Sequence, residues 1–192
     1  MNILYINKFF HINGGVDRYF FDLANLMEQK GHNVALFSTT SNPQNKSIWD
    51  KYFVSYLPYE ETDLISKIRF GLRIFYSVEA RNKIGKLLDD FKPDIVHIQS
   101  IYHYISPSIL PEIYQRKIPI IYSLGDFHIV APNYNLFHDD KICEITKPDR
   151  YYKTILHKCV KDSYFASFGE VCSDIPADSC EMSFDLNPSG LF

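Results

Sequence analysis

The sequence lacks the signals of several large protein classes. No stretch approaches the roughly 18 consecutive apolar residues of a membrane-spanning helix. The N-terminus also lacks the basic segment followed by an apolar one that marks a secreted protein. Only four of the 192 residues are cysteine, which is too few for a disulfide framework and is typical of a reduced compartment. We therefore expect a cytoplasmic protein without a membrane span.

Motifs for common cofactors and for hydrolysis are also missing. A dinucleotide-binding turn needs G-x-G-x-x-G and an acidic residue after the second strand, but the chain has only Gly14 and Gly15, and the second expected strand is followed by Thr39 and Thr40. No Gly-Lys-Ser/Thr follows a strand, which excludes a P-loop, and no G-x-S-x-G is present for a serine hydrolase. We expect no cofactor, and an NAD- or flavin-dependent enzyme is the least favoured alternative.

A metal site is not expected either. Cys143 and Cys159, together with His128, His138 and His157, supply suitable ligand atoms. However, no C-x-x-C or H-x-x-x-H spacing brings any of them together on one turn or helix. We interpret them as separate loop and surface residues.

The charge of the chain argues against one partner and leaves another open. A formal net charge of -3 is unlike that of a general nucleic-acid binder, so no nucleic-acid partner is expected. Residues 62–91 combine basic and aromatic side chains in a helical pattern. Such a segment can contact an anionic membrane surface. Alternatively, the aliphatic parts of its Lys and Arg side chains can cover the apolar side of a helix that faces the core, with their charges in water.

Alternating strand and helix patterns run through most of the chain. With 46% apolar residues, 192 residues suffice for one domain with a sizeable core. We predict strands at 2–6, 33–38, 52–56, 95–98 and 119–124, and helices at 16–30, 62–91, 107–114 and 151–168. This alternation predicts an α/β fold, a single Rossmann-like domain with a doubly wound parallel sheet of order 3-2-1-4-5.

The predicted strand order also locates a functional crevice. In an open parallel sheet, ligands bind beyond the carboxyl ends of the strands where the strand order reverses. Here that point lies between the first and fourth strands. The crevice should therefore be lined by residues 8–15, 97–106 and 125–134.

Two adjacent glycines, Gly14 and Gly15, stand where the first strand turns into the first helix. Glycine allows positive φ and close approach, and a helix start offers unpaired N–H groups at the positive end of its dipole. The junction therefore has the features of an anion-binding site. The alternative is that the two glycines only make a tight turn.

A series of segments resembles the N-terminal domain of family 4 glycosyltransferases. The similar segments, in order, are 2–10 (NILYINKFF), 14–20 (GGVDRYF), 30–34 (KGHNV), 92–98 (KPDIVHI), 102–103 (YH) with 106–110 (SPSIL), and 131–134 (APNY). The resemblance implies a GT-B architecture, in which two Rossmann-like domains face each other, the first binding the acceptor and the second the nucleotide-sugar donor. It implies a retaining transfer without an obligatory metal, onto a saccharide or lipid-linked acceptor, in polysaccharide or glycolipid biosynthesis.

The resemblance also assigns roles to particular residues. The expected substrate-binding residues are Gly14, Gly15, Arg18, His97, His103 and Asn133. By this resemblance the two glycines would approach the donor phosphates, and Arg18 would shape the same loop. The two histidines and the loop around Asp126 would face the acceptor, with Asp126 as the candidate catalytic residue.

The chain departs from the family pattern in three ways. Gly125 precedes Asp126 where the family usually has a histidine, so a hydrogen-bonding group near the transferred sugar is missing. Ala131 and Ile145 stand where related sequences often have cysteine, which leaves no four-cysteine metal site. The donor-binding domain is absent, so the 192 residues correspond to half of a GT-B enzyme and are expected to be inactive alone.

The resemblance covers residues 1–168 and stops where the composition changes. Residues 169–192 carry five acidic and no basic side chains and show no helix or strand period. We expect a loosely ordered acidic tail, and a frameshifted or prematurely ended reading frame is our hypothesis for its origin. The alternative function for the whole chain is a non-catalytic saccharide- or nucleotide-binding module with a Rossmann-like fold.

Overall fold

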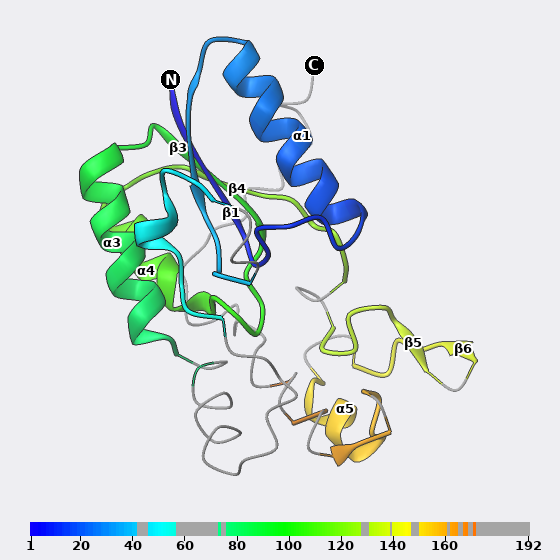
Figure 1. Cartoon of the computed structure of the whole chain (residues 1–192). Coiled ribbons are helices and arrows are strands. Elements are labelled where there is room, and N and C mark those ends of the chain that lie inside the picture. Colours follow the sequence, from blue (N-terminus) through cyan, green and yellow to red (C-terminus); the bar gives the residue numbers. More distant parts are fainter. Residues whose placement is uncertain are drawn as a thin grey trace.

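A buried apolar strand at the N-terminus forms the interior of the sheet. This strand, β1 (Asn2–Asn7), pairs in parallel with β2 (Asn33–Phe37) on one side and with β3 (Ile95–Ser100) on the other. The strand β4 (Ile120–Tyr122) pairs in parallel with β3. The order is therefore β2-β1-β3-β4, as seen in Figure 1. This parallel arrangement confirms the predicted α/β class and the predicted order of these four strands.

These coordinates come from a computed structural model. It describes residues 1–41, 46–56, 73, 76–127, 131–138, 140–146, 150–160, 162–164, 167–168 and 171. The predicted acidic tail at 169–192 lies outside the described residues except for residue 171, and so do residues 62–72 and 74–75 of the predicted basic and aromatic helix at 62–91.

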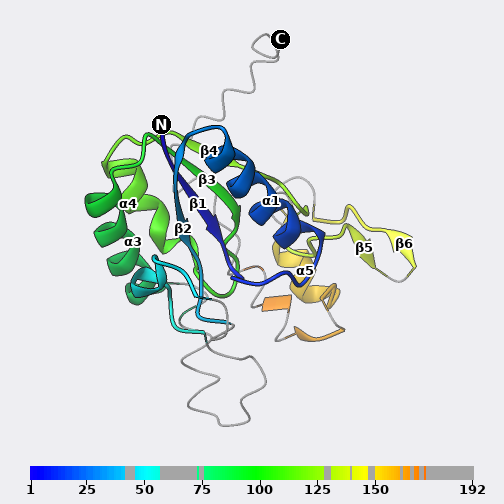
Figure 2. The same ribbon diagram turned by 45° about the horizontal axis from the view of Figure 1, so that its top comes forward.

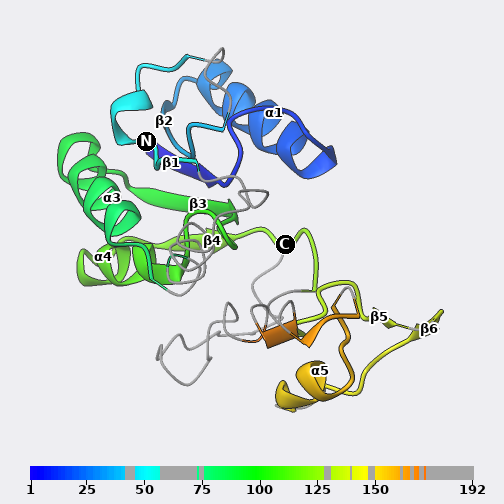
Figure 3. The same cartoon turned by 60° about the horizontal axis from the view of Figure 1, so that its bottom comes forward.

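Helices cover both faces of the sheet. The helix α1 (Gly15–Gln29) lies on one face, and α3 (Val78–Phe91) lies on the other beside η2 (Pro107–Ile109) and α4 (Leu110–Gln115). Figures 2 and 3 show these two layers on opposite sides of the strands. The sheet is thus doubly wound, and successive crossovers go to opposite faces on the two sides of β1.

The side chains of β1 explain its continuous apolar sequence. Leu4 and Ile6 are fully buried in the larger core cluster, together with residues of α3 and α4. Tyr5 points to the opposite face and packs edge-on against Phe20 of α1, with 6.3 Å between ring centroids. Because successive strand residues alternate between faces, a strand covered on both sides needs apolar residues throughout.

The predicted third strand, 52–56, is wrong. The chain there forms a short 3₁₀ helix, η1 (Asp50–Tyr52), and then a single parallel bridge between Val54 and Thr39. Two backbone hydrogen bonds hold the bridge, from Val54 N to Ser38 O and from Thr40 N to Val54 O, each 2.9 Å. Phe53 is buried against Phe10, with ring centroids 4.9 Å apart. The bridge lies beside the end of β2, where the strand was expected, but does not extend into a ladder.

The C-terminal part differs more from expectation. The helix predicted at 151–168 is described as a helix only at α5 (Tyr152–Leu156), and Lys158 after it has a positive φ of 51°. A small antiparallel hairpin, β5 (Phe137–His138) and β6 (Lys141–Ile142), lies between β4 and α5, where no strand was predicted. None of the helices in the described ranges is long and apolar enough to cross a membrane.

A glycine in the left-handed conformation, Gly31, follows the end of α1. Gly31 has a φ of +82°, Gly31 N donates to Glu28 O at 2.9 Å, and His32 N donates to Met27 O at 3.1 Å. This hydrogen-bond pair is a Schellman motif, which places its C′ residue in the left-handed region.

We predict that Gly31→Ala lowers the free energy of unfolding by about 1–2 kcal/mol, because an L-residue is strained at this φ. Urea unfolding of the purified chain measures the change. Gly15→Ala is the matched control, since no positive φ and no atom within 4 Å constrains Gly15, and it should unfold at the same or a higher urea concentration. Equal effects of the two substitutions would contradict the assignment.

Candidate functional site

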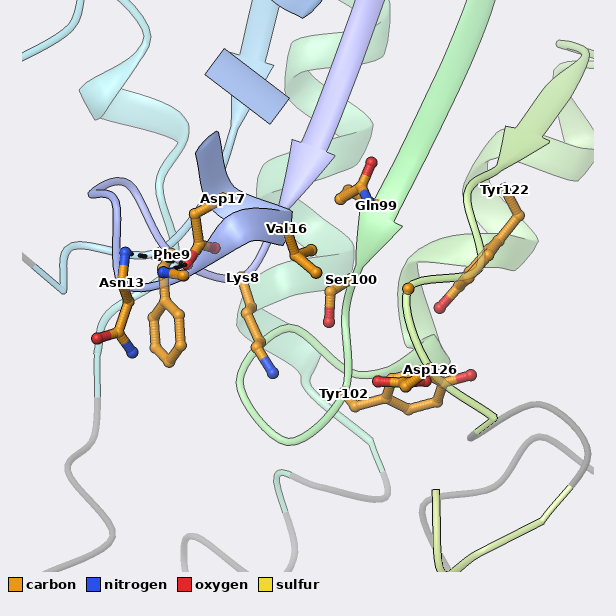
Figure 4. Close-up of a pocket in the computed structure, with 12 residues that line it drawn as sticks. Lys8, Phe9, Asn13, Val16, Asp17, Gln99, Ser100, Tyr102, Tyr122 and Asp126 are labelled. Atoms are coloured by element: carbon orange, nitrogen blue, oxygen red, sulfur yellow. Dashed lines mark hydrogen bonds between the residues drawn. The ribbon is translucent and has the colours of Figure 1, made fainter. Parts of the chain in front are cut away.

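A pocket of about 210 Å³ opens beyond the carboxyl ends of β1, β3 and β4. Figure 4 shows its lining side chains, which come from the segment after β1, the first turn of α1, the ends of β3 and β4 and the segments that follow these two strands. Its lining residues are Lys8, Phe9, Asn13, Gly14, Val16, Asp17, Gln99, Ser100, Tyr102, Tyr122, Gly125 and Asp126. The predicted segments 8–15, 97–106 and 125–134 each contribute, so the crevice lies where the strand order placed it.

One buried carboxylate, that of Asp17, organises the loop between β1 and α1. Asp17 is only 6% exposed, and its Oδ1 accepts a hydrogen bond from Asn7 Nδ2 at 2.8 Å. Its Oδ2 accepts from the backbone N–H groups of Asn13 and Gly14, each at 3.1 Å. A carboxylate in the first helical turn is also favoured by the helix dipole. Asp17 therefore fixes the loop that carries Lys8, Phe9 and the two glycines.

The glycine pair has a different geometry from the one expected. Neither Gly14 nor Gly15 has a positive φ; Gly14 is extended, with a φ of -163°. A Cβ added at either position would meet no atom within 4 Å. The turn itself therefore requires no glycine here, and the pair leaves open space beside the pocket.

The start of α1 keeps three backbone donors available. The first helical hydrogen bond runs from Arg18 N to Gly14 O at 3.1 Å. The N–H groups of Gly15, Val16 and Asp17 have no hydrogen-bond partner among the described residues. Lys8 also lines the pocket and makes no ion pair in the described part of the chain, its Nζ lying 5.4 Å from the centre of the Phe9 ring. These groups can bind an anion at this end of the pocket.

Two polar side chains at the end of β3 were not predicted as site residues. Gln99 and Ser100 are 8% and 7% exposed, both line the pocket, and neither side chain has a hydrogen-bond partner among the described residues. The strand register passes from Ile98 opposite Ile6 to Ser100 opposite Asn7, so Gln99 is the extra residue of a bulge. A bulge lets two consecutive residues reach the same site. The sequence signal that could have indicated these two site residues is a pair of polar residues at the end of an otherwise apolar, buried strand.

Hydroxyl and carboxylate groups form the opposite wall, around Tyr122, Tyr102 and Asp126. Burial raises the pKa of Tyr122 strongly, and the neighbouring Tyr102 and the Asp126 carboxylate raise this pKa further. Tyr122 therefore keeps its proton at neutral pH and can donate a hydrogen bond.

Five of the predicted site residues lie outside the pocket lining. His97 is buried in β3, hydrogen-bonded through Nε2 to Ser123 Oγ at 2.7 Å and packed on Tyr5; this burial lowers the pKa of His97. Arg18 is exposed on α1 and pairs with Asp22 at 3.4 Å. His103 lies in the loop after β3 with a positive φ of 66°.

The fourth, Asn133, is 1% exposed and has no side-chain hydrogen bond among the described residues. Gly15 also lies beside the lining rather than in it, whereas Gly14 and Asp126 belong to the lining itself.

Gly125, where a histidine was expected from the resemblance, is constrained by packing. A Cβ at this position would lie 3.2 Å from Val16 Cγ2. The loop after β4 therefore approaches the start of α1 closely, and a larger side chain would require Val16 to move.

Metal ligation has no geometric support in the described ranges. No three histidine, cysteine, aspartate or glutamate side chains there are grouped to hold a metal ion. Cys143 and Cys159 are free thiols, one partly exposed and one buried.

Comparison with known proteins connects this site to one family. Residues 13–147 match the family model of Glycosyltransferase Family 4. A Klebsiella pneumoniae protein described as an uncharacterized 42.6 kDa protein in cps region is 26% identical over 149 residues. The alignment covers 71% of this chain and 40% of that protein, so the chain spans less than half of the relative's length.

We predict that Asp17→Ala lowers the free energy of unfolding by about 2–3 kcal/mol, because it removes the buried hydrogen bond from Asn7 Nδ2 and the shared acceptor of the Asn13 and Gly14 N–H groups. Asp22→Ala on the same helix is the matched control. Its carboxylate is 68% exposed and pairs only with Arg18, so its loss should change the free energy of unfolding little. Chemical denaturation of both variants measures the difference, and similar values would contradict the role given to Asp17.

Proposed function

The chain belongs to Glycosyltransferase Family 4, and from this premise we propose that it supplies the acceptor-binding half of a retaining sugar transferase. The donor is a nucleotide-sugar, held mainly by a second domain in a GT-B arrangement. The acceptor is a saccharide or a lipid-linked saccharide. The position of the pocket, beyond the carboxyl ends of parallel strands, supports binding of a small polar ligand there.

The start of α1 is the observation that carries this proposal. Positions 14 and 15 are glycine although neither the φ angle nor the packing there requires it, and the space beside them is open. The adjacent N–H groups of Gly15, Val16 and Asp17 have no partner among the described residues. A diphosphate fits these features, because its oxygens accept backbone hydrogen bonds and need close approach. The donor phosphates would thus reach this loop from the facing domain.

The proposed reaction replaces one bond of the donor sugar by another. The acceptor hydroxyl oxygen forms a bond to the anomeric carbon, and the bond from that carbon to the nucleoside diphosphate breaks. The hydroxyl proton leaves with the diphosphate. Asp126 lines the pocket, and in this proposal its carboxylate accepts a hydrogen bond from the attacking hydroxyl and so orients it.

The biological setting is part of the proposal. The Klebsiella pneumoniae relative is described by its place in a cps region, which supports a role for the present chain in building a cell-envelope polysaccharide. The low cysteine content supports a cytoplasmic location. A lipid-linked acceptor would bring the protein into peripheral contact with the membrane.

Substitution at Gly15 tests the donor contact. We predict that Gly15→Val, in a reconstituted two-domain enzyme, raises the donor KM by about tenfold or more, because its side chain fills the space that the phosphates need. The thermal midpoint should stay within the error of wild type, since nothing lies within 4 Å of the added Cβ. Asn25→Val, exposed on the same helix, controls for a β-branched residue and should leave both values unchanged. An unfolded Gly15→Val protein, or an unchanged donor KM, would contradict the phosphate contact.

The 192-residue chain by itself should bind donors weakly. A few backbone hydrogen bonds at about 1 kcal/mol each cannot reach the roughly 4 kcal/mol that a 1 mM dissociation constant represents. Calorimetric titration with uridine- and guanosine-diphosphate sugars, followed by a turnover assay with a generic acceptor, tests this. Micromolar binding or turnover without a second component would overturn the assignment of this chain to the acceptor side alone.

A further inference from the structure

The least expected feature of the pocket is its pair of buried polar side chains without partners. Gln99 and Ser100 are more than nine-tenths buried, yet neither side chain is hydrogen-bonded to another described residue. Their polar atoms are not among the buried, unpartnered side-chain atoms of the described residues, so they reach the open space of the pocket, where a water or a ligand can bond to them. The bulge at Gln99 turns both residues toward the pocket instead of letting one of them face away.

The chemistry of these groups favours a ligand rich in hydroxyls. A glutamine amide both donates and accepts, and a serine hydroxyl does the same. Asp126, also in the lining, adds an acceptor. Neighbouring hydroxyls of a sugar can satisfy this mixed set, because each hydroxyl also donates and accepts. A phosphate or carboxylate only accepts hydrogen bonds, so it leaves the acceptor atoms of Gln99 and Ser100 unused; the Asp126 carboxylate would repel it, against the attraction of Lys8.

An aromatic wall completes the pocket opposite the polar groups. Phe9 lines the pocket, and its ring is held by Tyr104 with 5.2 Å between centroids. Tyr104 in turn stacks on Tyr56 at 5.2 Å with an interplanar angle of 14°. The C–H groups on one face of a pyranose ring pack well on the electron-rich face of such a ring. Phe9 is thus a rigid apolar surface beside hydrogen-bonding groups.

The size of the pocket limits the ligand further. About 210 Å³ is smaller than the roughly 300–1,000 Å³ of pockets that enclose drug-sized ligands. One sugar ring is therefore a better match than a nucleotide or an oligosaccharide. The N–H groups of Gly15, Val16 and Asp17 lie at the edge of the same pocket, in the first turn of α1.

We propose that this pocket binds a single neutral pyranose unit of the acceptor, with Gln99 and Ser100 forming hydrogen bonds to its hydroxyls and Phe9 packing on its apolar face. This inference rests on the proposed function, because that function identifies the bound sugar as part of the acceptor. It adds specificity-determining residues to the site and selects a neutral sugar, rather than an anionic headgroup or a uronic acid, as the group that enters the pocket.

The Gln99 side chain offers a direct readout. In the full 192-residue chain labelled with ¹⁵N, titration with methyl glucoside, methyl galactoside and methyl mannoside should shift the side-chain amide signals of Gln99 for at least one of the three. Inorganic phosphate and glucuronate should not shift these signals. Absence of a shift with every neutral hexoside, or a stronger response to phosphate or glucuronate, would overturn the proposal.

Gln99→Leu separates a ligand-binding role from a structural one. Because the Gln99 amide makes no hydrogen bond to another described residue and Leu nearly preserves its volume, the thermal midpoint should stay the same or rise. Hexoside affinity should fall about 5- to 10-fold, as expected for the loss of one or two hydrogen bonds. Gln115→Leu, exposed on α4, is the matched control and should change neither value. A lower thermal midpoint for Gln99→Leu, or unchanged hexoside binding, would show that Gln99 does not read a ligand.

A kinetic comparison keeps this inference distinct from the proposed function. In a reconstituted two-domain enzyme, Gln99→Leu should raise the acceptor KM and leave the donor KM unchanged, the reverse of the pattern expected for Gly15→Val. If only the Gln99 effect is missing, the inference about the acceptor sugar fails and the proposed function stands. If hexosides bind at Gln99 but Gly15→Val leaves the donor KM unchanged, the donor contact fails and the sugar pocket stands.

Discussion

The buried carboxylate of Asp17 is the constraint on which the site depends. It joins the end of β1, through Asn7, to the loop amides of Asn13 and Gly14 and to the first turn of α1. These hydrogen bonds are charge-assisted and shielded from water, which makes them stronger than neutral surface bonds. A loop of seven residues is thereby held in one conformation, with Lys8 and Phe9 toward the pocket and the glycine pair at its edge. The sheet supplies the location of the site, but this carboxylate determines its shape.

Much of the fold could be predicted because it follows from periodicity and from rules of chain connection. Four predicted apolar segments form the four strands of the sheet, and the helix predicted at 16–30 is α1, which ends at Gln29. The segment around Val54 was predicted wrongly, because burial of Tyr52 and Phe53 in two different directions imitates strand alternation. The short hairpin β5–β6 could not be predicted, because a strand of two residues is too short to show an alternating pattern.

The pocket segments could also be predicted, but not which side chains enter the pocket. Strand order alone locates the carboxyl ends of β1, β3 and β4, whatever residues follow them. The direction of a side chain depends on register, and one extra residue at Gln99 changes which consecutive residues face the site. His97, two positions earlier, packs on Tyr5 under α1 and bonds to Ser123 instead. A bulge and a loop held by Asp17 are tertiary features without a local sequence signature.

The same carboxylate explains why phosphate recognition here depends on geometry more than on charge. The positive end of the α1 dipole is already offset in part by Asp17, which lies within the first helical turn. A phosphate at the N–H groups of Gly15, Val16 and Asp17 would thus gain directed hydrogen bonds but little net electrostatic attraction from the helix. Lys8 adds one cation, and Asp126 at the far wall opposes it. Such an arrangement is suited to orienting a diphosphate whose binding energy comes from elsewhere, and it leaves the pocket itself to a neutral ligand.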